Sequence, residues 1–336
     1  MKKRNVILFF VVMFLLIGSA AGLQAAKEVK AVPVAGGLYF VEGLDGGNVA
    51  FLVTDEGVLV VDSGTSPEEG KLIIAQIAKI TDKPVKYLVL THYHGDHTFG
   101  LQAFPASTVV IAQQNTADNI RILNEPRIRG MMEQGMPEAI AAQKLKVDKL
   151  RKKKGKDLKK EEERLKTLET EFAELQGLRF VYPAIAYETK LRVYLGGQEI
   201  EVIYPGPAHT NGDSLVYFPG LKAAHMGDLL FVGSYPYIGS EAGCDTANWI
   251  AKLGEVSGWD VEKFIPGHGP LAGKEGLLRM AAYLGDLRQA VKAAIAAGQS
   301  LEQAKKMAPL PAWKDLTWPQ LFPQNVEAVY HELSRK

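Results

Sequence analysis

The chain has 336 residues, of which 47% are hydrophobic, and this is enough apolar material for one large domain with a buried core. A formal net charge of +1 argues against a protein that binds nucleic acid or acidic ligands through its overall charge. The single cysteine, Cys244, excludes an internal disulfide, so stability has to come from the core and from any bound metal.

The first 26 residues have the pattern of a secretory leader. Three basic residues at positions 2–4 precede an apolar run over 6–17, and small residues then extend to Ala26. The apolar run is short for a membrane-spanning helix. We therefore expect 1–26 to be a signal peptide and 27–336 to be the mature domain, periplasmic or secreted. An uncleaved leader, which would attach the protein to a membrane, is the alternative.

Short strands follow this segment. Apolar and β-branched runs predict strands over residues 38–41, 49–53 and 58–61, and a helix over 68–80 comes next. The run Val-Lys-Tyr-Leu-Val-Leu at 85–90 then predicts a further buried strand.

The most informative segment is Thr-His-Tyr-His-Gly-Asp-His at residues 91–97. Imidazole and carboxylate groups suit Zn²⁺, Mn²⁺ or Fe, and four of them this close together indicate a metal site. The glycine allows a tight turn after the preceding strand, so the side chains are expected on a strand-end loop that is open to solvent. On such a turn His92 and His94 can face one point. Asp96 and His97 can face another, so two adjacent metal ions fit.

After a strand over residues 108–112 the pattern changes. Apolar residues recur every three or four positions in charged segments from about 125 to 178, which predicts a helical insertion. An antiparallel helical hairpin is the economical interpretation, and one long kinked helix is the alternative. Residues 144–160 are dominated by Lys and Arg but lack interleaved aromatic residues for base stacking, so we interpret them as a solvated surface. The hairpin is also a candidate contact for a homodimer, or a cover over the active site.

Further candidate ligands lie beyond the insertion. His209 lies in GPAHTNGD and His268 in PGHG, each directly after an apolar run that predicts a strand. Asp228, in MGDLLF, is also expected at a strand end. His225 and His331 fall outside this set: we interpret His225 as a core histidine or a support of the site, and His331 as exposed.

The rest of the chain continues the α/β pattern. Strands are predicted over 191–195, 200–204 and 214–218, and helices over 246–256, 274–296 and 326–333. Periodicity indicates the class, α/β, and leaves the order of the strands open.

The motifs HYHGDH, GPAHTNGD, MGDLLF and PGHG, in this order and at these separations, resemble those of the metallo-β-lactamase superfamily. The resemblance covers about residues 32–285 apart from the insertion, and it implies a four-layer αββα sandwich with metals at one edge. It also implies seven metal ligands in two groups that share one carboxylate: His92, His94 and His209; Asp96, His97 and His268; and the bridging Asp228.

The function that the resemblance implies is that of an exported dinuclear zinc hydrolase, with Fe or Mn as the other candidate metals. Two zinc ions lower the pKa of bound water to roughly 7, so a bridging hydroxide would attack a small carbonyl-type substrate such as an ester, thioester, lactone or amide. Asp96 and Asp228 are the expected catalytic residues, because Asp96 would orient the hydroxide and Asp228 would bridge the metals.

Two other functions remain open. The first is β-lactam hydrolysis, although β-lactamases of the superfamily usually have a cysteine at the position of Asp228. They also often have a lysine three residues later, where this chain has Phe231. The second is a metal-containing binding or relay protein that docks a partner through the helical hairpin. An intact ligand set favours turnover over binding alone.

Three features near the motifs have two interpretations each. Asp62, at a position where the family often has an acidic residue, either supports the metal loop or caps the following helix. The aromatic run 231–238, with Trp249, forms either an apolar wall beside the metals or part of the core. Thr210 and Asn211 either donate hydrogen bonds at the site or only form a turn.

Overall fold

The structure is a computed structural model that describes residues 28–153 and 156–334. The predicted signal peptide lies outside the described residues. Chain contacts divide the protein into a sandwich unit, residues 29–119 with 182–336, and a helical unit that contains residues 120–181. None of the helices described is both long and apolar enough to cross a lipid bilayer.

One sheet of the sandwich unit has seven strands in sequence order. They are β1 (Lys30–Ala35), β2 (Leu38–Glu42), β3 (Val49–Val53), β4 (Val58–Val61), β5 (Val85–Val89), β6 (Val109–Gln113) and β7 (Ile185–Tyr187). Pairing is antiparallel from β1 to β4 and parallel from β4 to β7. Strand β4 is buried along its whole length, as expected for a strand in the middle of a covered sheet.

The second sheet has five strands in the order β12-β11-β10-β9-β8. They are β8 (Lys190–Leu195), β9 (Gln198–Ile203), β10 (Leu215–Phe218), β11 (Ala223–Phe231) and β12 (Lys263–His268). Strands β11 and β12 are parallel, and the other neighbours are antiparallel.

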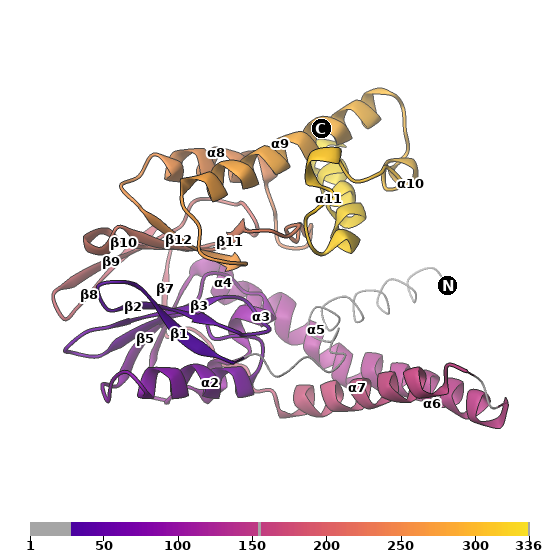
Figure 1. Cartoon of the computed structure of the whole chain (residues 1–336), viewed down its shortest axis with the longest axis horizontal. Coiled ribbons are helices and arrows are strands. Elements are labelled where there is room, and N and C mark those ends of the chain that lie inside the picture. The colour runs from indigo at the N-terminus through magenta and orange to yellow at the C-terminus, as the bar shows by residue number, and fades with distance from the viewer. Residues whose placement is uncertain (1–27, 154–155, 335–336) are drawn as a thin grey trace. The chain divides into compact units, whose positions relative to one another are not determined.

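The two sheets face each other across one hydrophobic core. Residues of the first sheet, such as Leu52 and Val61, pack with residues of the second, such as Val202 and Ile265. Helix α2 (Pro67–Ala78) lies on the outer side of the first sheet, and α8 (Thr246–Ser257) and α9 (Lys274–Ala296) lie on the outer side of the second (Figure 1). This arrangement is the four-layer αββα sandwich, and the predicted fold class is confirmed. Helix α11 (Phe322–Ser334) packs against α9.

The helical unit contains α5 (Glu125–Gly130), α6 (Met136–Lys153) and α7 (Leu158–Gly177). Helices α6 and α7 run antiparallel, as shown by ion pairs from Lys144 to Glu169 at 2.8 Å and from Arg151 to Glu162 at 2.7 Å. They are therefore two helices and not one long kinked helix. Three basic residues of α6, Lys144, Lys146 and Arg151, pair with acidic residues of α7.

The two edge strands of the first sheet escape the sequence patterns. Strand β1 has no fully buried residue and contains a proline, and β7 has only three residues. Edge strands need neither a continuous apolar run nor a full set of backbone donors, so periodicity detects them poorly.

Candidate metal centre

The first ligand motif lies where β5 ends. After Val89 the chain turns into α3, a single helical turn over Gly95–Thr98. His92 and His94 precede this turn, and Asp96 and His97 lie in it. The four side chains are therefore held by the end of a buried parallel strand.

Asp228 does not lie at a strand end, contrary to the prediction. It lies inside β11, which continues to Phe231. Gly227 has a φ of +50°, and the pairing of β11 with β12 shifts register on both sides of it. Such an irregularity redirects the next side chain without ending the strand, and it brings Asp228 to the metal loop.

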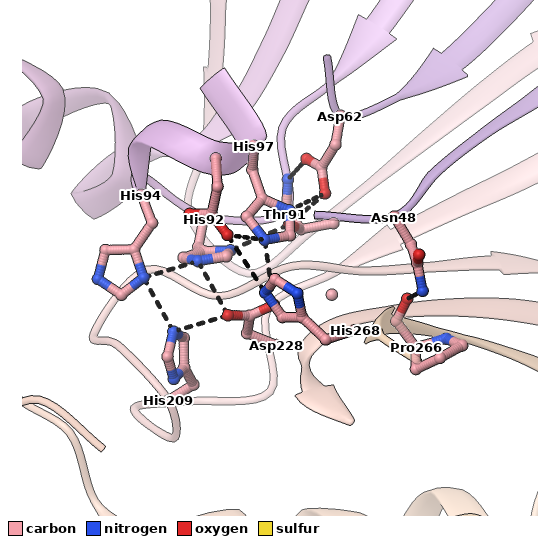
Figure 2. A network of polar contacts seen from close by, with 12 residues as sticks. Asn48, Asp62, Thr91, His92, His94, His97, His209, Asp228, Pro266 and His268 are labelled. Carbon is pink, nitrogen blue, oxygen red and sulfur yellow. Dashed lines mark hydrogen bonds and ion pairs between the residues drawn. The ribbon is translucent and has the colours of Figure 1, made fainter. Parts of the chain in front are cut away.

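The structure brings all seven predicted ligands into two groups. The first donor set consists of His92, His94 and His209 with Oδ2 of Asp228, and the second consists of Asp96, His97 and His268 with Oδ1 of Asp228. Figure 2 shows six of these side chains converging, three of them from the segment 92–97 and the others from three later parts of the chain.

Three of the four donor atoms in the first set are nitrogen atoms. Nδ1 of His94 lies 2.9 Å from Nε2 of His92 and 3.1 Å from Nε2 of His209. Oδ2 of Asp228 lies 3.6 Å from Nε2 of His92 and 3.3 Å from Nε2 of His209. Four donor atoms thus surround one point.

Oxygen atoms contribute half of the second donor set. Oδ2 of Asp96 lies 3.4 Å from Nε2 of His97 and 3.2 Å from Nε2 of His268. Oδ1 of Asp228 lies 3.1 Å and 3.5 Å from the same two nitrogen atoms. The two oxygen atoms of Asp228 therefore face different donor sets, as a bridging carboxylate requires.

These distances fit zinc. Ligand bonds of about 2.0 to 2.1 Å in a tetrahedron place the donor atoms about 3.3 Å apart, and the eight separations given above scatter around that value. Nε2 of His97 and Oδ1 of Asp228 are buried and have no hydrogen-bond partner among the described residues. Buried polar atoms without partners are costly, and a metal ion would satisfy both.

Electrostatic interactions within the cluster shift the pKa values of several donors far from their usual values. Burial, helped by the neighbouring His97, holds the pKa of His92 well below its usual value, so its imidazole is neutral. Burial would raise the pKa of Asp228, but His268 and His97 hold that pKa well below its usual value. Burial would likewise lower the pKa of His97, but Asp228, Asp96 and Asp62 raise it well above its usual value. The cluster therefore attracts positive charge.

Asp62 supports the metal loop from behind. Its carboxylate accepts hydrogen bonds from the backbone N and the Oγ1 of Thr91, each at 2.7 Å, and from Nδ1 of His97 at 2.7 Å. The N-cap of α2 is Ser66, whose hydroxyl accepts from the backbone of Glu69. Of the two interpretations of Asp62, the structure thus favours support of the loop.

The loop that carries His209 is held by a buried turn. Asp213 accepts hydrogen bonds from the backbone N and the hydroxyl of Thr210, and burial raises the pKa of Asp213 to about 7. The carbonyl of Asn211 accepts from Asn115 and from the hydroxyl of Tyr204. Thr210 and Asn211 are therefore turn residues.

Aromatic side chains flank the second donor set. The ring of Phe231 stacks on the ring of His268 at 4.9 Å, and Trp318 contacts the same imidazole edge-on at 5.4 Å. Trp249 is fully buried and lies 5.5 Å from the ring of His209, while Tyr235 belongs to the core. The predicted apolar wall thus includes Phe231, whereas much of the aromatic run is core. Trp318 escaped the sequence analysis because it belongs to no motif.

The donors differ in their access to solvent. The side chains of Asp96 and His268 are 20% and 12% exposed, whereas no other ligand exceeds 4%. The cluster thus opens on the side of the second donor set, next to the partly buried Trp318. The remaining histidines take no part as ligands: His225 is buried in β11 and His331 is exposed.

Curated proteins that are similar to this chain include the following two. A linear primary-alkylsulfatase from Pseudomonas sp. is 24% identical over 66% of the chain. The alpha subunit of a 2,4-dinitroanisole O-demethylase from Nocardioides sp. is 26% identical over 64% of the chain. The chain spans only 41% and 50% of the lengths of these relatives.

A solved structure and a family profile agree with this likeness. A stereoselective inverting sec-alkylsulfatase from Pseudomonas sp. superposes with a TM-score of 0.65 at 18% identity, over 90% of this chain and 50% of that one, which shows a shared fold. Residues 43–268 match the profile of the metallo-beta-lactamase superfamily, and they include every residue of both donor sets. The chain therefore belongs to the metallo-beta-lactamase superfamily.

Proposed function

We propose that this protein is a zinc-dependent hydrolase that uses two metal ions to cleave an ester-type bond in a small molecule with an apolar group. The observation that carries the proposal is the position of Asp228, whose two carboxylate oxygens face two separate donor sets. A binding module needs no such shared carboxylate, whereas two-metal hydrolysis depends on a pair of adjacent ions.

Zinc, when bound, supplies Lewis acidity that activates water at neutral pH and polarises the oxygen of the bond to be cleaved. The residues supply the geometry around it. Asp228 holds the two donor sets in a fixed relation. Asp96 is ionised, because His97 and His268 lower its pKa well below the usual value despite its burial. Its carboxylate is the most exposed of the ligands and is placed to orient the attacking water.

The open side of the cluster supports a substrate with an apolar group. Trp318 and Phe231 both contact His268, one of the two ligands that reach solvent. The relatives' names point the same way, since one acts on alkyl sulfates and the other on an aromatic methyl ether. We therefore extend the expected carbonyl substrates to sulfate esters and activated aryl ethers.

The test combines a hydrolysis screen with metal analysis. Zinc-reconstituted protein is assayed with carboxylic esters, thioesters, lactones, β-lactams, alkyl sulfates and 2,4-dinitroanisole. We expect about two zinc ions per chain and turnover of at least one class. Asp228→Ala should lower activity by orders of magnitude and weaken metal binding in both donor sets.

An exposed aspartate provides the matched control. Asp260→Ala removes an exposed carboxylate that pairs with Lys222 at the surface and should leave metal content and turnover unchanged. Less than one zinc ion per chain in the wild-type protein, or full activity in Asp228→Ala, would refute the proposal.

A further inference from the structure

Asn48 holds the PGHG segment, residues 266–269 at the end of β12, through three hydrogen bonds. Its side-chain amide donates to the carbonyl of Pro266 at 2.9 Å and to that of Gly269 at 2.8 Å. Its backbone N donates to the carbonyl of Gly267 at 2.7 Å. Figure 2 shows Asn48 beside Pro266, with His268 pointing from the same segment toward Asp228.

All four carbonyl groups of residues 266–269 accept hydrogen bonds. The one remaining carbonyl, that of His268, accepts from the backbone N of Val232 at 2.9 Å. A Cβ on Gly267 would lie 2.0 Å from Oδ1 of Asp228, and one on Gly269 would lie 2.1 Å from the carbonyl oxygen of Val232. The backbone of this segment thus packs directly against the bridging carboxylate, and Asn48 donates three of the hydrogen bonds that hold it there.

The segment before Asn48 contacts the other two ligands of the second donor set. The backbone N of Gly47 donates to the carbonyl of Asp96 at 3.0 Å. A Cβ on Gly47 would lie 2.1 Å from Cε1 of His97, so only glycine allows this approach. The loop between β2 and β3 therefore contacts Asp96, His97 and the segment that carries His268.

The loop between β2 and β3 is held by hydrogen bonds to two buried side chains, those of Glu69 and His225. The carboxylate of Glu69 accepts hydrogen bonds from the backbone N of Asp45 and of Gly46. The backbone N of Gly227 donates to Nδ1 of His225 at 3.1 Å, so Nε2 of His225 carries the proton and donates to the carbonyl of Asn48 at 3.2 Å. The buried His225 thus acts on the site through Asn48.

We propose that Asn48 is a positioning residue that sets the metal affinity of the second donor set more strongly than that of the first. This inference rests on the proposed function in one respect, since it requires that the protein bind two metal ions. The three hydrogen bonds that Asn48 donates all go to backbone carbonyls around His268, and none of them reaches His92, His94 or His209.

The test measures metal binding, with zinc alone as the probe. Asn48→Asp keeps the shape of the side chain but replaces the amide donor with a carboxylate facing two carbonyl oxygens. We expect the affinity for one of the two zinc ions to fall by about 10- to 100-fold, with a much smaller change in the other affinity. Titration with a competing chelator reports both constants, and the absorption spectrum of the cobalt-substituted protein reports the environment of each ion. Asn48→Ala, which removes the amide without adding charge, should give the same selective loss.

Asn248 offers a matched control. Its amide also donates to two loop carbonyls, those of Pro205 and Pro207, but these lie before His209, whose own position is fixed by the turn from Thr210 to Asp213. Asn248→Asp should leave both zinc affinities unchanged. Circular dichroism of the metal-free proteins checks that all variants are folded.

The possible outcomes separate the inference from the proposed function. Wild-type protein that binds two zinc ions but hydrolyses none of the substrates would refute the proposed hydrolase function. The proposed role of Asn48 would not be affected. The inference would be overturned if both zinc affinities were unchanged in both Asn48 variants, or if both affinities fell equally. An equal fall in affinity in Asn248→Asp would also overturn it. Wild-type protein with a single zinc site would overturn both.

Discussion

Nδ1 of His97 donates a hydrogen bond to Oδ2 of Asp62 across 2.7 Å, and both side chains are fully buried. The bond fixes the imidazole so that Nε2, the other ring nitrogen, points to Oδ1 of Asp228 at 3.1 Å. Asp62 has a φ of +65°, a left-handed conformation that aspartate tolerates better than most residues. The end of β4 thus determines the orientation of a ligand that lies 35 residues later in the chain.

Asp62→Asn should weaken metal binding by about 10- to 100-fold. The carboxylate accepts from three donors, whereas an amide has one acceptor oxygen and would turn its NH₂ group toward the backbone N of Thr91. Zinc titration with a chelator measures the change. An affinity equal to that of the wild-type protein would show that Asp62 plays no part in orienting His97.

The ligand set could be predicted from the sequence because its residue types and spacing leave few other interpretations. Imidazoles and carboxylates packed into the segment 91–97 have one common use, and the later motifs each carry one further ligand. The long helix α9 was also predictable, since its apolar period runs over many turns.

Features that depend on distant pairing could not be predicted. The place of Asp228 inside β11 follows from a register shift against β12, which no local pattern encodes. Asn48 and Pro266 are 218 positions apart, and an isolated asparagine resembles any turn residue until the fold brings the two segments together. Trp318 reaches the site in the same way, from a segment beyond the family match.

Trp318→Ala should raise KM for substrates with a long apolar group about tenfold, because the indole offers a large apolar surface beside the open ligands. The kcat should change less, since Trp318 contacts His268 at the ring edge and is not itself a ligand. Kinetics on p-nitrophenyl acetate and octanoate separate the two constants. Trp259→Ala is the control, because Trp259 packs on Tyr217. An equal effect on both esters would contradict an apolar substrate contact.

Hydrolysis of β-lactams should be weak compared with the preferred substrate. A cation that grips the substrate carboxylate contributes roughly 1.5 to 3 kcal/mol, or one to two decades in kcat/KM. Phe231 stands where β-lactamases often place that lysine, and its ring is stacked on His268. Kinetics on a penicillin, a cephalosporin and a carbapenem measure the difference. A kcat/KM of about 10⁶ M⁻¹s⁻¹ or more would fall among good enzymes and overturn this expectation.

Glu171→Gln should stabilise the protein above neutral pH. Burial, with a smaller contribution from Glu174, raises the pKa of Glu171 in α7 to about 7, from an ordinary value of 4.5. At pH values between these two pKa values, Glu171 is protonated in the folded state and ionised in the unfolded state. The free energy of unfolding therefore falls as pH rises from about 4.5 to 7, and this loss persists at higher pH.

Glutamine cannot ionise, so the variant avoids this loss. We expect the difference in unfolding free energy between Glu171→Gln and wild type to be near zero at pH 4.5 and to favour the variant at pH 8. Urea unfolding at both pH values measures it, and comparison of the two proteins at each pH cancels the titration of the metal ligands. Glu163→Gln, at an exposed position on the same helix, is the control, and its difference in unfolding free energy from wild type should not increase with pH in this way. A constant difference across the pH range would mean that Glu171 ionises normally in the folded protein.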